Sequence, residues 1–399
     1  MGSNHINLAI EAEGNGNLVA FIQIIQKNLP TAVMFWFAFL VSIMISKAYQ
    51  KRCISNDPEA SASIRHMSKI ERIAWTLLII ILPSLLIGFR HYEVGADTMN
   101  LAIGFSRLSF DHTSIIIWDR ILYSLLRYGS FLLSNGNPTV FLFTMSFLTL
   151  FILVRALDKW ADKISIPLAL FVYYALFGMQ LLNQSRQLIA LSILLYAIPY
   201  LLARKSTKYL WFVFIASLFH FTASIGIVFA LLHFKKGYFA PIKKALFYLS
   251  WLLSPILMYP FLILLNRIIP SSYSGYIEIA TYGGVGLGLV ITIFPVVVPI
   301  FLFKRYLVDY TSKYLSRVAL LTYPLRFAGY YSYFLMRLNY YSSVFMVLLI
   351  PILVGNVKSR SKRRLVRFIV IVVLMTYYVV HYMFLDAGSI FPYRNILMN

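Results

Sequence analysis

The segment 88–99, with the sequence GFRHYEVGADTM, places an arginine, a histidine and two carboxylates directly after the apolar run 73–89. Fixed charges beside a hydrocarbon-spanning run are costly, so they are found mainly where function uses them. Gly95 favours a turn that would fold Asp97 back toward Arg90. A guanidinium can hold phosphate oxygens in a bidentate way, and a carboxylate or imidazole can accept the proton of a hydroxyl. The alternative is an interfacial arginine beside a solvated loop.

Further polar and ionisable candidates accompany the later apolar runs. They are Arg186, Gln187, His220, Glu278, Arg326, Arg337 and Tyr341. Arg186 and Arg337 have an alternative explanation as interfacial anchors, and His220 as a packing histidine between two aromatic neighbours. Arg326 lies inside an apolar run, where an arginine needs a partner. Several arginines with few carboxylates suit the binding of a phosphate or diphosphate without a metal ion.

The composition indicates a polytopic membrane protein. Hydrophobic residues make up 60% of the 399 residues and charged residues only 13%, and the mean hydropathy is +0.75, far from the values of a soluble domain. The net charge of +22 comes mostly from short basic segments between apolar runs, which set orientation and meet anionic lipid. No nucleic-acid partner is needed. The single cysteine, Cys53, excludes an internal disulfide and a cysteine-based metal site.

Apolar runs that we interpret as membrane crossings predict an all-α fold with about 10–12 transmembrane helices, since a helix rises about 1.5 Å per residue across a core of about 30 Å. The runs are 30–48, 73–89, 140–156, 167–182, 188–203, 246–265, 287–303, 318–336, 340–354 and 368–385. The run 115–133 contains Asp119, Arg120 and Arg127, so we expect an amphipathic or half-inserted helix, broken afterwards by the sequence NGNP at 135–138.

A broken helix near His220 follows from the distribution of positive charge. One continuous helix over 209–232 would place the lysines after it, and every later basic loop, on the outer side of the membrane. Two short limbs that enter and leave on the same side would keep these basic loops cytoplasmic. On this topology the basic segments are cytoplasmic. Residues 1–28 form an outer or interfacial segment, 29–385 a single membrane domain, and 386–399 an outer tail. The outer loops 90–137 and 266–284 are expected to line the site.

Motifs for other chemistries are missing or weak. The chain has no GxxxxGK[ST] and no HExxH, and its outer loops have no Asp-x-Asp. Glu11 and Glu13 have the spacing of a metal pair but are typical of a solvated segment. The glycines at 283–288 lack a preceding strand and predict a flexible helix start. We therefore expect no cofactor and no metal.

Several ordered landmarks resemble the EpsG family of bacterial exopolysaccharide and O-antigen (Wzy-type) polymerases. They are Arg90-x-x-x-Val94-Gly95-x-Asp97-Thr98, Arg186-Gln187-x-x-Ala190, Leu218-Phe219-His220, and Arg337 with Tyr340-Tyr341 before Ile350-Pro351. The resemblance covers about 73–354 and rests on the order of the landmarks and their shared face. Ala96 stands where the family pattern has threonine or serine, which leaves the charged positions untouched.

The resemblance implies an inner-membrane polymerase with an active site facing the periplasm and a fold similar to the GT-C glycosyltransferases. Its substrates would be donor and acceptor oligosaccharides on undecaprenyl diphosphate, and its other partners membrane lipids and a chain-length regulator protein. Transfer would invert the anomeric carbon. The expected roles are diphosphate binding by Arg90, Arg186, Arg326 and Arg337, base or acceptor orientation by Asp97 or His220, and weaker substrate contacts by Gln187, Glu278 and Tyr341.

Two alternatives belong to other classes of protein. A lipid-linked oligosaccharide flippase would also be polytopic and cationic, but its charges should run through a central cavity toward both faces. A membrane O-acyltransferase would need an acyl donor, often reached from inside.

Overall fold

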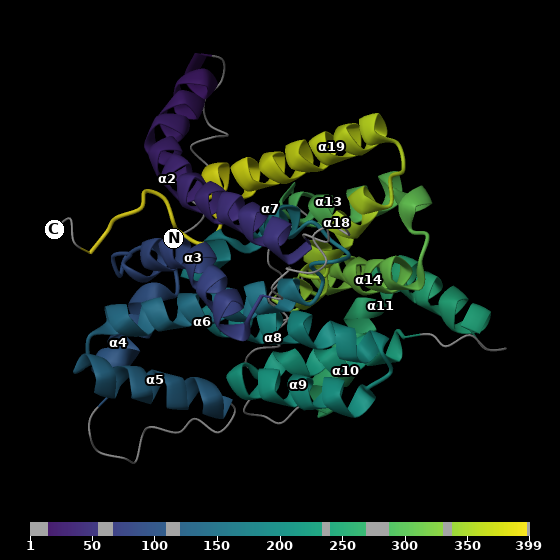
Figure 1. Cartoon of the computed structure of the whole chain (residues 1–399), viewed down its shortest axis with the longest axis horizontal. Coiled ribbons are helices and arrows are strands. Elements are labelled where there is room, and N and C mark those ends of the chain that lie inside the picture. Colours follow the sequence, from purple (N-terminus) through teal and green to yellow (C-terminus); the bar gives the residue numbers. More distant parts are fainter. Residues whose placement is uncertain are drawn as a thin grey trace, which may run out of the picture. The chain divides into compact units, whose positions relative to one another are not determined.

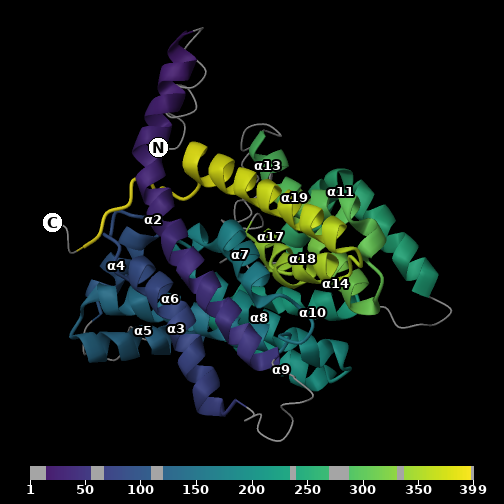
Figure 2. The same cartoon turned by 45° about the horizontal axis from the view of Figure 1, so that its top comes forward.

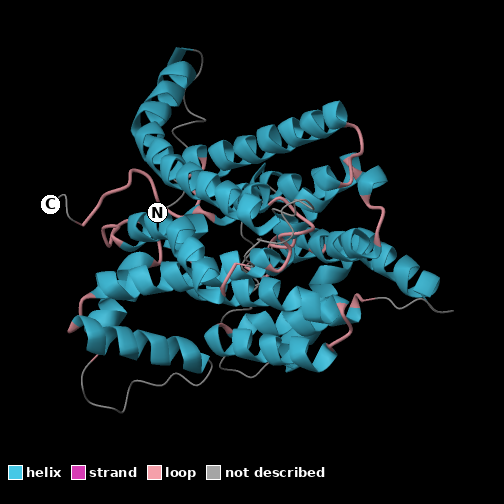
Figure 3. Ribbon diagram, viewed as in Figure 1, coloured by secondary structure: helices cyan, strands magenta, loops and turns pink. Residues whose placement is uncertain are grey.

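The computed structural model describes residues 15–54, 67–108, 120–233, 240–268, 287–329 and 337–396. The regular elements of these residues are helices (Figure 3), and their one β-type contact is an isolated bridge between Arg90 and Asn395. The predicted all-α class is confirmed. The chain divides into two compact units, the first made of 1–162, 166–189 and 374–399 and the second of 163–165 and 190–373.

The first unit contains the helices on both sides of the charged segment 88–99. They are α2 (Asn15–Ile54), α3 (Lys69–Gly88), α4 (Thr98–Ser106), α5 (Ile121–Ser134), α6 (Pro138–Asp158), α7 (Ile166–Phe177), the 3₁₀ turn η4 (Met179–Leu182), the start of α8 (Ser185–Leu202), and the π-helix η7 (Val379–Phe384). Local signals set several boundaries. Ser68 and Glu71 form a capping box at the start of α3, and the left-handed Asn135 ends α5 before Asn137 caps α6.

Helix α2 differs from its predicted form. It begins at Asn15 rather than near residue 30, so part of the expected outer segment 1–28 is continuous with the first span. The reason is that residues 17–29 contain no glycine or proline to stop the helix.

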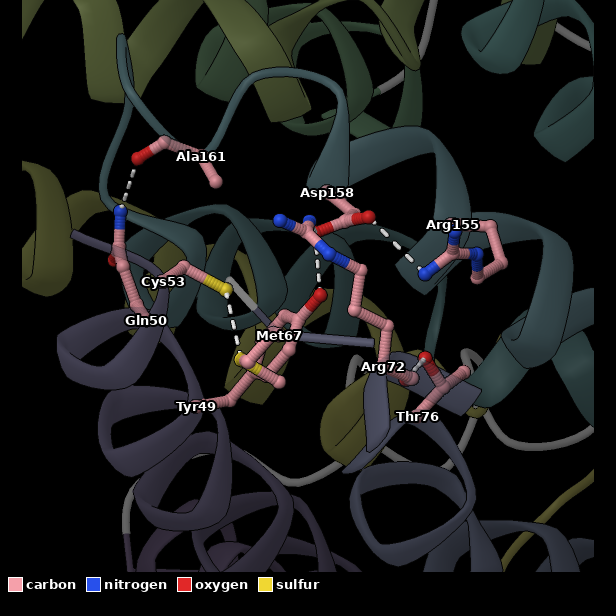
Figure 4. Close-up of polar contacts among 9 residues, drawn as sticks. All are labelled: Tyr49, Gln50, Cys53, Met67, Arg72, Thr76, Arg155, Asp158 and Ala161. Carbon is pink, nitrogen blue, oxygen red and sulfur yellow. Dashed lines mark hydrogen bonds and ion pairs between the residues drawn. The ribbon is translucent and has the colours of Figure 1, made fainter. Parts of the chain in front are cut away.

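Helix α3 packs against both α2 and α6, as the two whole-chain views show (Figures 1 and 2). At the end of α3 that lies far from Arg90, Asp158 joins all three helices (Figure 4). Its carboxylate accepts from the Tyr49 hydroxyl and, at 2.9 Å, from Arg72 Nη1, and pairs with Arg155 Nη1 at 3.0 Å. The Asp158 side chain is 7% exposed, whereas its partners Arg72 and Arg155 are 32% and 30% exposed. Asp158 therefore holds α2, α3 and α6 together at this end.

The second unit contains the remaining helices. They are the rest of α8, α9 (Ser206–Phe219), η5 (Phe221–Ile225), α10 (Gly226–Leu231), α11 (Ala240–Ile268), α13 (Leu287–Leu302), η6 (Lys304–Tyr306), α14 (Tyr310–Leu320), α15 (Thr322–Ala328), α17 (Asn339–Ser343), α18 (Met346–Gly355) and most of α19 (Arg360–Tyr378).

The predicted broken helix at His220 is confirmed. Helix α9 ends at Phe219, His220 is extended at φ −154°, and η5 and α10 then pack back against α9. The Tyr209 hydroxyl donates to the Gly226 carbonyl oxygen at 2.8 Å. A Cβ on Gly226 would lie 2.9 Å from Val213, so a glycine is needed for the two limbs to approach this closely.

The sequence predicts one continuous helix over 318–336, and the structure shows that this prediction is wrong. Helix α14 ends at Leu320 and α15 begins at Thr322. Pro324 explains the break, because proline lacks an N–H for the Leu320 carbonyl and its ring clashes with that group.

Among the described residues, five helical segments are long and apolar enough to span a membrane: Ile22–Cys53, Lys69–Gly88, Pro138–Asp158, Ser185–Leu202 and Arg360–Phe384. Shorter apolar helices of 10–17 residues cover Ile166–Phe177, Ser206–Phe219, Phe221–Leu231, Leu289–Leu302 and Asn339–Gly355. The chain is therefore a multi-pass membrane protein, while the total of 10–12 crossings stays a prediction.

The basic residues near one end of α3 predict how this helix is oriented in the membrane. Because the Asp158 end carries Lys69, Arg72 and Arg155, it should face the cytoplasm and the Arg90 end should face outward. In a Cys53→Ser background, the exposed Ser389 changed to cysteine should react with a membrane-impermeant maleimide in intact spheroplasts. Ser361→Cys, in the basic start of α19, should react only after permeabilisation. The reverse labelling pattern would contradict this topology.

Candidate functional site

Arg90 is held at the end of α3 by hydrogen bonds to three parts of the first unit. Its side chain is 1% exposed. Nη1 donates to the Ile87 carbonyl at 2.6 Å, Nη2 to the Leu182 carbonyl at 2.9 Å, and Nε to Thr98 Oγ1 at 3.1 Å. Burial lowers the pKa of Arg90 to about 9, so the guanidinium is still charged at neutral pH. Arg90 therefore ties the end of α3 to the start of α4 and to η4.

The turn predicted at Gly95 is present, and a glycine is required there. Gly95 has φ +95°, and an added Cβ would lie 2.7 Å from Asn183 Oδ1 and 2.9 Å from the Leu182 carbonyl oxygen. The turn brings Thr98, the neighbour of Asp97, to the Arg90 guanidinium. Asp97 itself is half-buried at the N-cap position of α4.

The C-terminal tail packs directly against this loop. His91 N donates to the Arg394 carbonyl at 2.8 Å and Ile396 N to the Phe89 carbonyl at 3.0 Å, which makes the bridge noted above. Gly95 N and Ala96 N donate to the carbonyls of Ser389 and Gly388, each at 2.9 Å. The loop and the tail therefore lie at the same end of the first unit.

Asn183 joins the loop, the tail and the segment before α8, and sequence reasoning did not select it. Its Nδ2 donates to the Gly388 carbonyl at 3.0 Å, and its Oδ1 accepts from Asp97 N at 3.4 Å. The side chain is 6% exposed. Asn183 thereby fixes the backbone of Asp97 relative to residues far away in the sequence.

Arg186 and Gln187 follow Asn183 by about one helical turn, in the first turn of α8. Arg186 is half-buried, with its Cζ 5.1 Å from the centre of the Tyr123 ring on α5, while Gln187 is 3% exposed. The first unit thus brings four predicted residues, Arg90, Asp97, Arg186 and Gln187, to one end of the fold.

The other predicted residues gather in the second unit around the broken helix. Thr222, two residues after His220, donates to the hydroxyl of the fully buried Tyr341 at 3.1 Å. Next to Tyr341, Ser342 shares a 2.8 Å hydrogen bond with Thr322, at the start of the short helix that carries Arg326. Arg337 is half-buried two residues before α17 begins.

Glu278 lies outside the described residues. Within the ranges that the structure describes, no group of three or more His, Cys, Asp or Glu side chains is arranged to hold a metal ion.

Gly388→Ala should separate the tail from the loop. Gly388 has φ +109°, and an added Cβ would lie 2.3 Å from Asn183 Nδ2, so strain of roughly 1–3 kcal/mol is expected. The thermal midpoint of the detergent-solubilised protein should fall. Gly129→Ala is the matched control, because no atom lies within 4 Å of its added Cβ. Equal midpoints for the two variants would show that this contact contributes nothing.

Comparison with known proteins gives one match. The sequence model of the EpsG family matches residues 73–395. No curated protein and no solved structure matches the chain. The match spans both clusters of candidate residues and extends beyond the predicted landmarks to Asn395, the residue that pairs with Arg90. Since the match covers most of the sequence, the chain belongs to the EpsG family.

Proposed function

We propose that this protein is a bacterial inner-membrane polysaccharide polymerase. It transfers a growing glycan from undecaprenyl diphosphate to a hydroxyl of a lipid-linked repeat unit at the periplasmic face. The observation that carries this proposal is membership of the EpsG family across residues 73–395 in a multi-pass membrane protein. A carboxylate and an arginine at one end of the first unit supply suitable chemistry.

The proposed reaction is a single inverting displacement. The acceptor hydroxyl oxygen forms a bond to the anomeric carbon while the bond from that carbon to the diphosphate breaks. The hydroxyl proton passes to the base, and the lipid diphosphate leaves with the electron pair. Arginines can balance the charge on this leaving group without a metal, because they remain cationic and match phosphate geometry.

Asp97 is the proposed base. Its carboxylate is half-buried, and its backbone is positioned by the Gly95 turn, by Asn183 and by the tail. Such positioning matters because a misplaced base loses much of its effect. His220 is the second candidate. Its backbone is extended, and it lies at the break between the two helical limbs.

The arginines divide by burial into two proposed roles. Arg186, Arg326 and Arg337 are half-buried, and we assign diphosphate contact to them. For Arg90 the sequence suggested the same role, but its three hydrogen bonds to the protein and its 1% exposure favour positioning of the loop. Gln187 and Tyr341 are buried as well, so substrate contacts by their side chains have less support.

Deletion of the gene tests the function. If the protein is a polymerase, lipopolysaccharide or exopolysaccharide ladders should collapse to single repeat units that are still attached to their carrier or core. Electrophoresis of the extracted glycans measures this, with the wild-type gene on a plasmid as the control. Loss of every repeat unit would instead support a flippase.

Asp97→Asn and His220→Ala separate the two candidate bases. Loss of a general base typically costs about 10²- to 10⁴-fold in rate, so Asp97→Asn should be nearly inactive while His220→Ala keeps measurable chain growth. Purified proteins should be compared for extension of lipid-linked repeats in EDTA, where wild-type activity is expected to persist. Wild-type rates for Asp97→Asn would remove it as the base, and recovery only with added magnesium would show a metal requirement.

A further inference from the structure

Exposed basic side chains gather at the start of α19 and just before it. They are Lys358, Arg360, Lys362, Arg364 and Arg367. Among the described residues, none of them forms an ion pair with a carboxylate. Arg363 is instead half-buried, and its Nε donates to the carbonyl oxygen of the buried Val357 at 2.8 Å. This bond fixes the start of α19, so the exposed charges are held close together.

A second basic segment, η6, is joined to the first. It carries the exposed Lys304 and Arg305, which likewise have no carboxylate partner in the part of the chain that the structure describes. Asn356 Nδ2 donates to the Tyr306 carbonyl oxygen at 2.9 Å, which links η6 to the end of α18, just before the first segment. The exposed Asp309 that follows η6 caps the start of α14. The exposed lysines and arginines of both segments therefore form one surface of the second unit, which we call the basic surface.

Exposed apolar side chains adjoin the basic surface on two helices. On α19, Leu365, Phe368 and Val372 are exposed, and their spacing of three and four residues places them on one side of the helix. On α13, Phe301 and Leu302 are exposed immediately before η6. Since α19 is part of a segment that can span a membrane, its exposed apolar side chains face lipid chains. The basic surface therefore lies where the hydrocarbon ends and the lipid headgroups begin.

We propose that the basic surface binds the headgroups of anionic glycerophospholipids in the cytoplasmic leaflet. Guanidinium and ammonium groups bind phosphate oxygens, and their aliphatic stems can lie along apolar side chains at the membrane boundary. The adjoining apolar side chains favour a lipid over an acidic protein, because one lipid molecule offers both an anionic headgroup and hydrocarbon chains. This inference goes beyond the proposed function and does not depend on it.

The proposal is narrower than the general attraction of basic loops to anionic membranes. The general attraction depends on net charge, so any two exposed lysines would contribute equally. A surface built from two segments depends also on Asn356, which carries no charge and joins them. Asn356→Ala should therefore weaken lipid binding while leaving the net charge unchanged.

Titration of the purified full-length protein with tail-labelled fluorescent phosphatidylglycerol, in a non-ionic detergent, tests the surface. A basic residue beside anionic lipid contributes roughly fivefold to binding. The double variants Lys304→Gln/Arg305→Gln and Arg360→Gln/Arg364→Gln should therefore each bind about 25-fold more weakly. Because the substituted side chains are exposed, both variants should keep the wild-type thermal midpoint, and either one tests the proposal if the other fails to fold.

The matched control is the double variant Lys243→Gln/Lys244→Gln. It removes two exposed lysines at the start of α11, in the same unit, and should bind like wild type. Equal weakening in this control would show that only net charge matters, and wild-type affinity in both double variants of the basic surface would show that the lipid binds elsewhere. Wild-type affinity in Asn356→Ala would contradict a surface that depends on the contact between the two segments.

Competing ligands identify the chemistry that is bound. Phosphatidylcholine with the same label and chains should bind weakly, and equal binding would overturn recognition of an anionic headgroup. Full displacement of the lipid by glycerophosphate would assign the surface to a soluble phosphate, and tighter binding of an acidic peptide would assign it to a protein partner; either result overturns the proposal. Raising the ionic strength from about 0.1 to about 1 M should weaken lipid binding, because the Debye length falls from about 10 to about 3 Å.

Discussion

A buried guanidinium must find hydrogen-bond acceptors inside the protein. At Arg90 this constraint determines how the segment 88–99 packs against the rest of the first unit. Among the described residues no carboxylate lies within ion-pair distance of Arg90, and its acceptors are two main-chain carbonyls and a hydroxyl. Leaving such a charge without partners would cost several kcal/mol. The end of α3, the start of α4 and η4 are therefore fixed relative to one another.

The tail completes the surroundings of that charge. Its backbone pairs with the loop on both sides of Arg90, and Tyr393 donates from its hydroxyl to the Leu86 carbonyl at 2.6 Å. At the opposite end of α3, Asp158 gathers two arginines and a tyrosine. Buried polar groups therefore hold α3 to its neighbours at both of its ends.

In the second unit the helical backbone is broken at His220. The extended His220 interrupts hydrogen bonding between α9 and η5, and the bond from Thr222 to Tyr341 holds the return limb against α17. Non-helical backbone at membrane depth is tolerated where protein or a water-filled cavity surrounds it.

The sequence by itself determined the helical class, the breaks at Asn135–Pro138 and His220, and the turn at Gly95, because hydropathy, charge parity and glycine or proline geometry act over a few residues. It also identified the EpsG family from ordered landmarks. Only the tertiary structure decided what Arg90 binds and which face of α5 meets Arg186. Only it showed that Asn183 contacts Gly388, 205 residues away. Contacts between such distant segments depend on the packing of whole helices, and nothing in the local sequence of either partner encodes them.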